Sequence, residues 1–147
     1  MKIAIGSDHR GYDAKRRLVQ MLRNLGHEVI DVGPEGHDSV DYPDYAYTVA
    51  KSVSEGKVER GILICGTGIG MCITANKVRG VRAALCADAQ TADGARRWND
   101  ANVLALSLRA TSPAVLHEIL DAWFGGQPSD DGADAANVGH LLDIEAT

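Results

Sequence analysis

Five short apolar runs recur along the chain, and segments with helical spacing of apolar residues separate them. The runs read KIAIG near residue 3, HEVIDV near 29, GILIC near 63, VRAALC near 84 and NVLALS near 104. Runs this short and rich in Val, Ile and Leu are typical of strands buried on both faces. Strands that alternate with helices predict a parallel sheet between two helical layers, an α/β fold of the α/β/α type.

Three segments place their apolar side chains on one helix face. They span residues 11–25, 43–55 and 113–124. Pro43 stands in the first turn of the second segment, and a Ser-Pro pair opens the third, as is common where helices begin. Gly26 follows the first segment, in the position that glycine favours just past a helix.

The carboxyl-terminal segment, residues 129–147, follows a stretch rich in Gly, Asp and Ser and predicts a short helix over residues 129–145. Its apolar residues are Val138, Leu141, Leu142 and Ile144. No strand follows for this helix to cover. We therefore expect it to pack on a partner subunit.

Composition fits one globular domain over residues 1–147, with 45% hydrophobic and 24% charged residues. A net charge of −5 and the absence of a Lys/Arg run argue against a nucleic-acid partner, although a small anion needs only a local positive pocket. No segment approaches the length of a membrane span. Three cysteines without a C-x-x-C pair predict free thiols and a cytoplasmic protein.

Polar residues collect where the predicted strands end, which is where ligands bind in open parallel sheets. They are Ser7, Asp8, His9 and Arg10 after the first strand, Cys65 to Gly70 after the third, Asp88 and Gln90 after the fourth, and Ser107 and Arg109 after the fifth. Asn99 precedes the fifth strand.

The segment after the third strand, CGTGIG, joins a thiol to a loop with glycine at every second position. Glycine lets a ligand approach the backbone closely, and a strand-to-helix loop aims N–H groups outward. Such donors would hold an anion, and they would stabilise Cys65 as a thiolate base or nucleophile. The spacing fits neither a dinucleotide loop nor a P-loop. The alternative is a structural cysteine, and we assign that role to Cys72, in a helix, and Cys86, in a strand.

The Asp8-His9 pair at the end of the first strand has two interpretations. Asp8 either caps the following helix or fixes the tautomer of a functional histidine. The spacing alone supports both interpretations.

Five motifs together closely resemble the type B ribose-5-phosphate isomerases, a family that includes galactose-6-phosphate isomerase. They are GSDHRGY, DYPDYA, GILICGTGIGMCITANK, GVRAALC and NDANVLAL, and the resemblance covers residues 1 to about 125. It implies a Rossmann-like or flavodoxin-like sheet. It also implies a homodimer or dimer of dimers with active sites at subunit interfaces, and no metal or nucleotide cofactor.

The family interconverts aldose and ketose phosphates through a cis-enediolate, and the resemblance assigns a role to each matching residue. Cys65 would move the proton between C1 and C2, with Thr67 as its hydroxyl partner. The backbone of Gly66, Gly68, Ile69 and Gly70 would hold the enediolate charge. Asp8 and His9 would contact the sugar or its phosphate, Asn99 a substrate oxygen, and Arg109 the phosphate.

The chain departs from the family at two places. Trp98 replaces a histidine credited with opening the sugar ring, and Ala133 and Asn137 replace two phosphate-binding arginines. These departures predict an altered substrate. A tetrose 4-phosphate has no ring to open and is shorter, and Trp98 would fill the space of a longer sugar. An unphosphorylated sugar would also explain the missing arginines, but it would leave Arg109 without its ligand.

Two other functions compete with this one. A cysteine on a strand-to-helix turn also suits a hydrolase or amidotransferase, which would need a histidine on another strand end. A non-catalytic partner subunit of a hetero-oligomeric isomerase is the third interpretation, against which the retained Cys65, Thr67 and glycine loop argue.

Overall fold

The computed structural model describes all residues from 1 to 147 and contains one parallel sheet. Its strands are β1 (Lys2–Ser7), β2 (Glu28–Asp31), β3 (Arg60–Cys65), β4 (Ala83–Leu85) and β5 (Val103–Ser107). They lie in the order β2-β1-β3-β5-β4, and every neighbouring pair is parallel. The expected three-layer α/β fold is confirmed. Relative to the flavodoxin order 2-1-3-4-5, the last two strands are exchanged, so β4 forms an edge.

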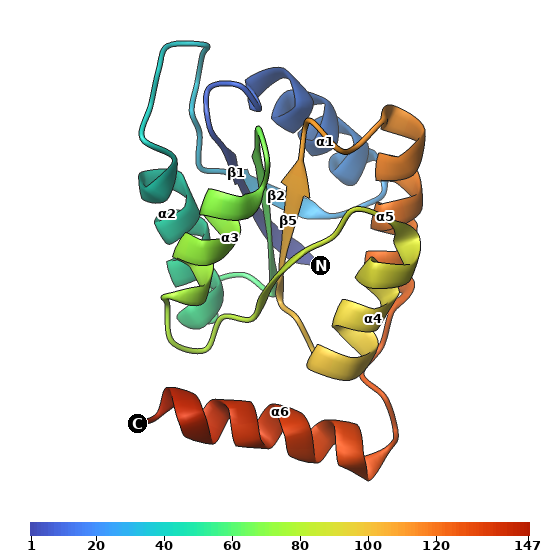
Figure 1. The fold of residues 1–147 in the computed structure, drawn as a ribbon. Coiled ribbons are helices and arrows are strands. Elements are labelled where there is room, and N and C mark those ends of the chain that lie inside the picture. Colours follow the sequence, from blue (N-terminus) through green and yellow to red (C-terminus); the bar gives the residue numbers. More distant parts are fainter.

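Six helices accompany the sheet. They are α1 (Tyr12–Asn24), α2 (Tyr42–Ser54), α3 (Ile69–Asn76), α4 (Ala89–Asn99), α5 (Pro113–Gly125) and α6 (Gly132–Glu145). Helices α1, α4 and α5 cover one face and α2 and α3 the other (Figure 1). None of the helices is both long and apolar enough to cross a membrane.

Each face of the sheet has its own apolar core. Leu18, Ala92 and Trp123 pack on the first face, and Val49 and Met71 on the second, all fully or almost fully buried. Successive residues of a strand point to opposite faces, so β3 sends Ile64 to the first core and Cys65 to the second.

The predicted elements agree with the structure except in detail. Cys86 is buried but lies just past β4, because that strand ends at Leu85, so its predicted place inside a strand is wrong. The last helix begins at Gly132 rather than at residue 129, since Asp131 caps it by accepting the N–H of Ala133 at 2.9 Å.

Helix α6 lies across the amino-terminal edge of the sheet, and among the other helices it contacts mainly α4 (Figure 1). None of its residues is buried, and Leu141, Leu142 and Ile144 are exposed. One contact ties its end to the body of the protein: the N–H of Gly80 donates to Glu145 at 2.9 Å. This position leaves an apolar helix face without a partner in the single chain.

Candidate active site

A cavity of about 440 Å³ opens at the carboxyl-terminal edge of the sheet, where β1, β3 and β5 end. It is lined by Asp8, Arg10, Tyr42, Cys65, Gly66, Thr67, Gly70, Leu108 and Arg109. Asp8, Cys65, Gly66, Thr67, Gly70 and Arg109 are among the residues that the sequence predicted. His9, Gly68 and Ile69 are their chain neighbours but do not line it.

Cys65 ends β3 at the wall of this cavity and is only 6% exposed. The backbone N–H of Gly68 donates to its Sγ at 3.0 Å. The turn that allows this bond needs glycine: Gly68 has a φ of +75°, and a Cβ there would lie 2.5 Å from a methyl of Leu85 and 3.0 Å from the backbone of Leu106. The sulfur of Cys65 therefore lies at the cavity wall beside a backbone N–H group.

Three further N–H groups of the loop are unused. Those of Gly66, Thr67 and Gly70 donate to no acceptor in the protein, whereas that of Ile69 donates to the Thr67 hydroxyl at 3.3 Å. They stand at the start of α3, where the helix dipole adds positive potential. A Cβ at Gly70 would lie 2.6 Å from the ring of Tyr42, an exposed side chain that would have to move to make room for it. The arrangement can hold an oxyanion beside the thiol.

The other two cysteines lack such surroundings. Burial raises the pKa of Cys86 to about 11 and also raises the pKa of Cys72. Both therefore stay protonated at neutral pH, which agrees with the structural roles that the sequence suggested.

Asp8 and His9 point to different partners. The Asp8 carboxylate accepts the N–H of Gly11 at 2.8 Å at the start of α1, and the structure contains no hydrogen bond between Asp8 and His9. The N–H of Val40 instead donates to His9 Nδ1 at 3.3 Å, which leaves the proton of the neutral ring on Nε2. The interpretation in which Asp8 fixes the tautomer of His9 is wrong. The backbone N–H of Val40, in the loop before α2, fixes it instead.

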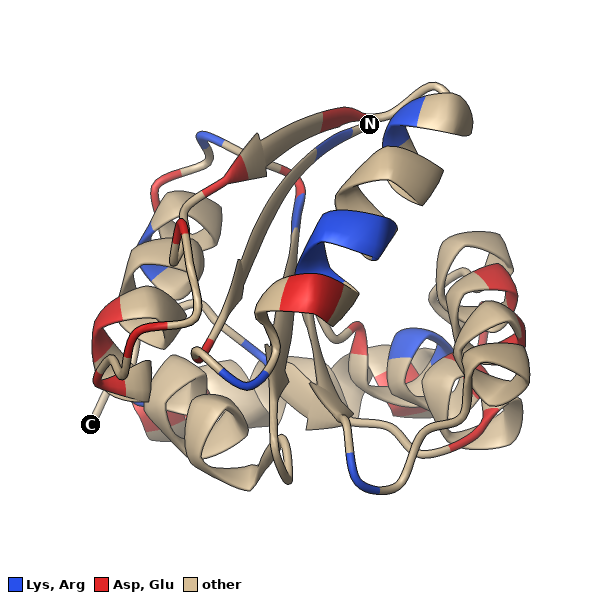
Figure 2. Cartoon of the chain, turned by 90° about the horizontal axis from the view of Figure 1, so that it is seen from above, with Lys and Arg blue, Asp and Glu red and all other residues tan.

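Two guanidinium groups enter the cavity. Arg10 and Arg109 both line it, both are exposed, and neither has a carboxylate partner. Basic segments lie on the loops at this edge in the view from above (Figure 2). Arg10 stands over the glycine loop, with one Nη 3.5 Å from where a Cβ of Gly66 would be. The pair suits a phosphate group.

No histidine lines the cavity around Cys65. The acyl-transfer alternative needs a histidine base beside the thiol, so the geometry argues against it. His117 lies on α5 and lines a different cavity.

The sequence model of a family described as Ribose/Galactose Isomerase matches residues 3–141 of the chain. The chain belongs to the ribose/galactose isomerase family. The resemblance of the sequence motifs to ribose-5-phosphate isomerases is thereby confirmed.

Relatives within the ribose/galactose isomerase family carry two substrate names. A D-erythrulose-4-phosphate isomerase of Pectobacterium atrosepticum is 46% identical over 129 residues, which are 86% of this chain and 84% of that protein. The ribose-5-phosphate isomerase B of Escherichia coli is 46% identical over 126 residues, 86% of this chain and 85% of that protein. The structure of the Clostridium thermocellum ribose-5-phosphate isomerase B superposes with a TM-score of 0.95 at 46% identity, covering 99% and 98% of the two chains.

Two positions tied to the ribose/galactose isomerase family by sequence, Trp98 and Asn99, lie far from this cavity. Both are exposed near the end of α4, which runs back from the carboxyl-terminal edge of the sheet to the amino-terminal edge. Neither lines the cavity of Cys65. The length of a strand, at about 3.3 Å per residue, separates the two edges. The sequence suggested that Trp98 fills the space of a longer sugar. In the structure, Trp98 does not reach the substrate cavity of its own chain.

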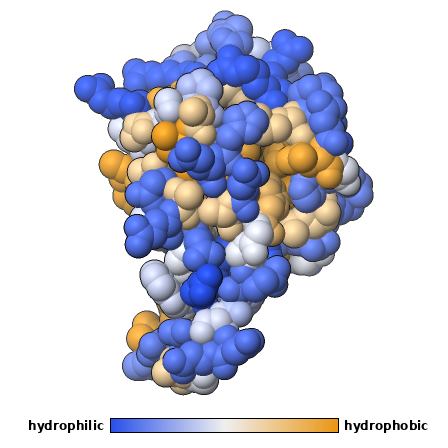
Figure 3. Space-filling model, turned by 90° about the vertical axis from the view of Figure 1, so that its right-hand side faces the viewer, coloured by the Kyte–Doolittle hydropathy of each residue, from blue (hydrophilic) through white to orange (hydrophobic).

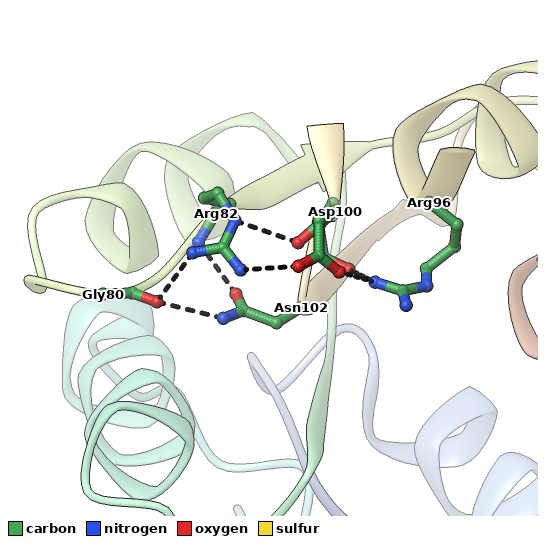
Figure 4. Close-up of polar contacts among 6 residues, drawn as sticks. Gly80, Arg82, Arg96, Asp100 and Asn102 are labelled. Atoms are coloured by element: carbon green, nitrogen blue, oxygen red, sulfur yellow. Dashed lines mark hydrogen bonds and ion pairs between the residues drawn. The ribbon is translucent and has the colours of Figure 1, made fainter. Parts of the chain in front are cut away.

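A polar network fixes the segment that follows Asn99 (Figure 4). Asp100 adopts a φ of +45°, which is unusual for a residue other than glycine. Its carboxylate pairs with Arg96 at 2.9 Å and with Arg82 at 3.5 Å, and its carbonyl accepts from Arg82 at 2.9 Å. The side chain of Asn102 links Arg82 to Gly80. The chain turns sharply after Asn99 and holds that turn rigidly.

Ala133 and Asn137 occupy the positions at which the resemblance implied phosphate-binding arginines, and both lie exposed on α6. This helix lies at the opposite edge of the sheet from Cys65. Sequence analysis placed Arg10 at this edge of the sheet without giving it a role, and it did not single out Tyr42 or Leu108. Tyr42 falls inside the motif DYPDYA, which the resemblance used.

Proposed function

We propose that this protein is an aldose–ketose isomerase of a short sugar phosphate, with D-erythrulose 4-phosphate as its preferred ketose. The supporting observation is one cavity that combines the Cys65 thiol, three unused backbone N–H groups and two unpaired arginines. The thiol serves as the base, the N–H groups form the oxyanion site, and the arginines form the phosphate site.

The reaction moves one proton between adjacent carbons. The Cys65 thiolate removes the proton from C1 of the ketose, and the electron pair forms the C1–C2 double bond while the carbonyl oxygen becomes an enediolate oxygen. The N–H groups of Gly66, Thr67 and Gly70 stabilise that charge. The Thr67 hydroxyl, exposed at the cavity wall, mediates proton exchange between the two oxygens. The Cys65 thiol, which exchanges its proton with water in the open cavity, then protonates C2, and this step yields the aldose.

A tetrose 4-phosphate suits the chain better than a pentose phosphate. Its 4-oxygen carries the phosphate, so it stays open and needs no acid–base group in place of Trp98. Its phosphate lies close to the reacting carbons, where Arg10 and Arg109 stand in the same chain as Cys65. The arginines that the ribose/galactose isomerase family carries at positions 133 and 137 are then dispensable.

We expect kcat/KM for D-erythrulose 4-phosphate to exceed kcat/KM for D-ribulose 5-phosphate by at least about tenfold. Steady-state assays of the purified protein with both ketoses measure it. Trp98→His places at this position the histidine that the resemblance implied. It should raise kcat/KM for D-ribulose 5-phosphate and so bring the kcat/KM values for the two ketoses closer together. A wild type that prefers ribulose 5-phosphate would refute the short-substrate proposal and leave the isomerase itself intact.

The single chain offers an apolar face for a second copy beside the site. Ile69 and Ile73 lie one turn apart on α3 and are 51% and 56% exposed, and Leu85 on the neighbouring edge strand is 41% exposed. Helix α6 leaves a further apolar face open. We infer a homodimer or dimer of dimers in which Asn99 of one subunit reaches the Cys65 cavity of its partner.

The three free cysteines fit the reducing cytoplasm, and the −5 charge fits a protein without a nucleic-acid partner.

Subunit sharing predicts complementation between two inactive variants. Cys65→Ala and Asn99→Ala should each lose most activity alone. After they are unfolded together and refolded, mixed dimers carry one intact site, so up to about a quarter of wild-type activity should return for random pairing. A mixture that stays as inactive as its parts, or a monomer by light scattering, would contradict the shared site.

A further inference from the structure

A second cavity, of about 320 Å³, lies between α1 and α5 on the face of the sheet opposite to Cys65. Its apolar lining includes Leu18 and Met21 from α1, Leu106 from β5 and Leu116 from α5. Figure 3 views the molecule from the side of α4 and α5, where apolar surface shows between polar side chains. A volume near the lower end of the range of small-molecule sites, with a mostly apolar lining, fits a small ligand.

Four polar side chains line this cavity: Arg17, Ser107, Thr111 and His117. Arg17 stands at the rim and pairs with no carboxylate in the protein. The hydroxyl of Thr111 is buried and has no hydrogen-bond partner. No Asp or Glu lines the cavity. A buried hydroxyl without a partner costs free energy unless something in the cavity supplies one.

We propose that this cavity binds a small amphipathic carboxylate. Its apolar body would lie among Leu18, Met21 and Leu116, and its carboxylate would accept from the Arg17 guanidinium and the Thr111 hydroxyl. One guanidinium matches one carboxylate in a bidentate pair, which is why a singly charged head is favoured over a phosphate. This ligand is distinct from the sugar phosphate in charge, polarity and place.

The segment after β5 lies between this cavity and the active site. Leu108 lines both cavities. Its N–H donates to the Cys65 carbonyl at 3.0 Å, and the N–H of Arg109 donates to the Gly66 carbonyl at 3.0 Å. Ser107 also lines the second cavity and donates to Gly66 at 3.1 Å. A carboxylate seated against Leu108 therefore acts on the segment that carries Arg109, and this consequence rests on the proposed function of Arg109.

Binding is tested without any activity assay, by NMR titration of the full chain with sodium octanoate and, separately, with 1-octanol. Octanoate should give saturable shifts at Leu106, Leu108 and Leu116 and should bind more tightly than 1-octanol. Arg17→Met should weaken octanoate about tenfold or more and leave 1-octanol unchanged, since a hydrogen bond to a charged group is lost. Arg16→Met is the matched control, because Arg16 lies next in the chain but does not line the cavity.

Two results would overturn the proposed site: equal octanoate affinity in wild type and Arg17→Met, or shifts scattered away from α1 and α5. Thr111→Val gives a second, milder test and should also weaken octanoate alone. If octanoate binds as proposed, the KM for D-erythrulose 4-phosphate should change at saturating octanoate in the wild type and not in Arg17→Met. An unchanged KM would refute the link through Leu108 while the binding site stands.

Discussion

Cys65→Ala should lower kcat/KM by about 10²–10⁴-fold, the contribution typical of a positioned general base. The reason lies in the surroundings of the sulfur: it closes a strand at the cavity wall and accepts the N–H of Gly68 at 3.0 Å. The remaining oxyanion and phosphate sites would still bind substrate, so the loss should fall mainly on kcat. Steady-state kinetics with D-erythrulose 4-phosphate measure it.

Cys72→Ala is the matched control for that variant. Burial raises the pKa of Cys72, and its thiol donates to the carbonyl of Ala83 at 3.5 Å on the far side of α3 from the cavity lining. We expect turnover within a few-fold of wild type and a small loss of stability. Cys65→Ala with near-normal turnover, in a protein whose circular dichroism and melting temperature match wild type, would remove Cys65 from the mechanism.

Arg10→Met and Arg109→Met should each raise the KM for D-erythrulose 4-phosphate by about 10–100-fold, because each removes a hydrogen bond to a doubly charged phosphate. Arg10 and Arg109 are the two cationic side chains that line this cavity. The kcat should change much less, since the phosphate does not take part in the proton transfer. The double variant should have a higher KM for D-erythrulose 4-phosphate than either single variant.

Two comparisons separate phosphate binding from general damage in these variants. Arg79→Met removes an exposed arginine that lines neither this cavity nor the second one and should leave KM unchanged. Inorganic phosphate should inhibit the wild type competitively and inhibit the arginine variants more weakly. Equal inhibition by phosphate in wild type and both variants would place the phosphate elsewhere.

The part of the site that sequence analysis predicted best is the part built from adjacent residues. Cys65, Thr67 and the glycines follow one another in a single turn, so their spacing fixes their geometry almost alone. The φ of Gly68 shows why the loop contains glycine at that position. The alternating strands and helices could be predicted for the same reason. The spacing of apolar residues along the chain locates them without knowledge of contacts between distant residues.

Positions that depend on distant contacts were harder to predict. His9 takes its hydrogen bond from Val40, which is 31 residues away, and nothing in the Asp8-His9 pair signals that partner. Asn99 stands close to the fifth strand in sequence, yet it lies at the amino-terminal edge of the sheet because α4 returns there before β5 begins. A linear motif does not say to which edge of the sheet it belongs.

The order of the last two strands shows the same limit. Strands β4 and β5 are consecutive, and either order satisfies the apolar pattern. In the structure, β5 lies inside the sheet and β4 forms the edge. Leu104 and Leu106 on β5 are accordingly almost fully buried, whereas Leu85 on β4 is 41% exposed. That difference in burial follows from the packed structure. The exposed edge in turn creates the apolar face proposed for the second subunit.

Proton exchange with solvent gives the most direct measurement of the central claim. In deuterated water, a thiolate base that shuttles a proton between C1 and C2 exchanges it with solvent at the enediolate stage. We predict that the pure protein incorporates deuterium into D-erythrulose 4-phosphate at C1 and forms the aldose deuterated at C2, and that Cys65→Ala does neither at a measurable rate. An aldose product that carries no deuterium at C2 in any trial, or exchange that persists unchanged in Cys65→Ala, would contradict the account.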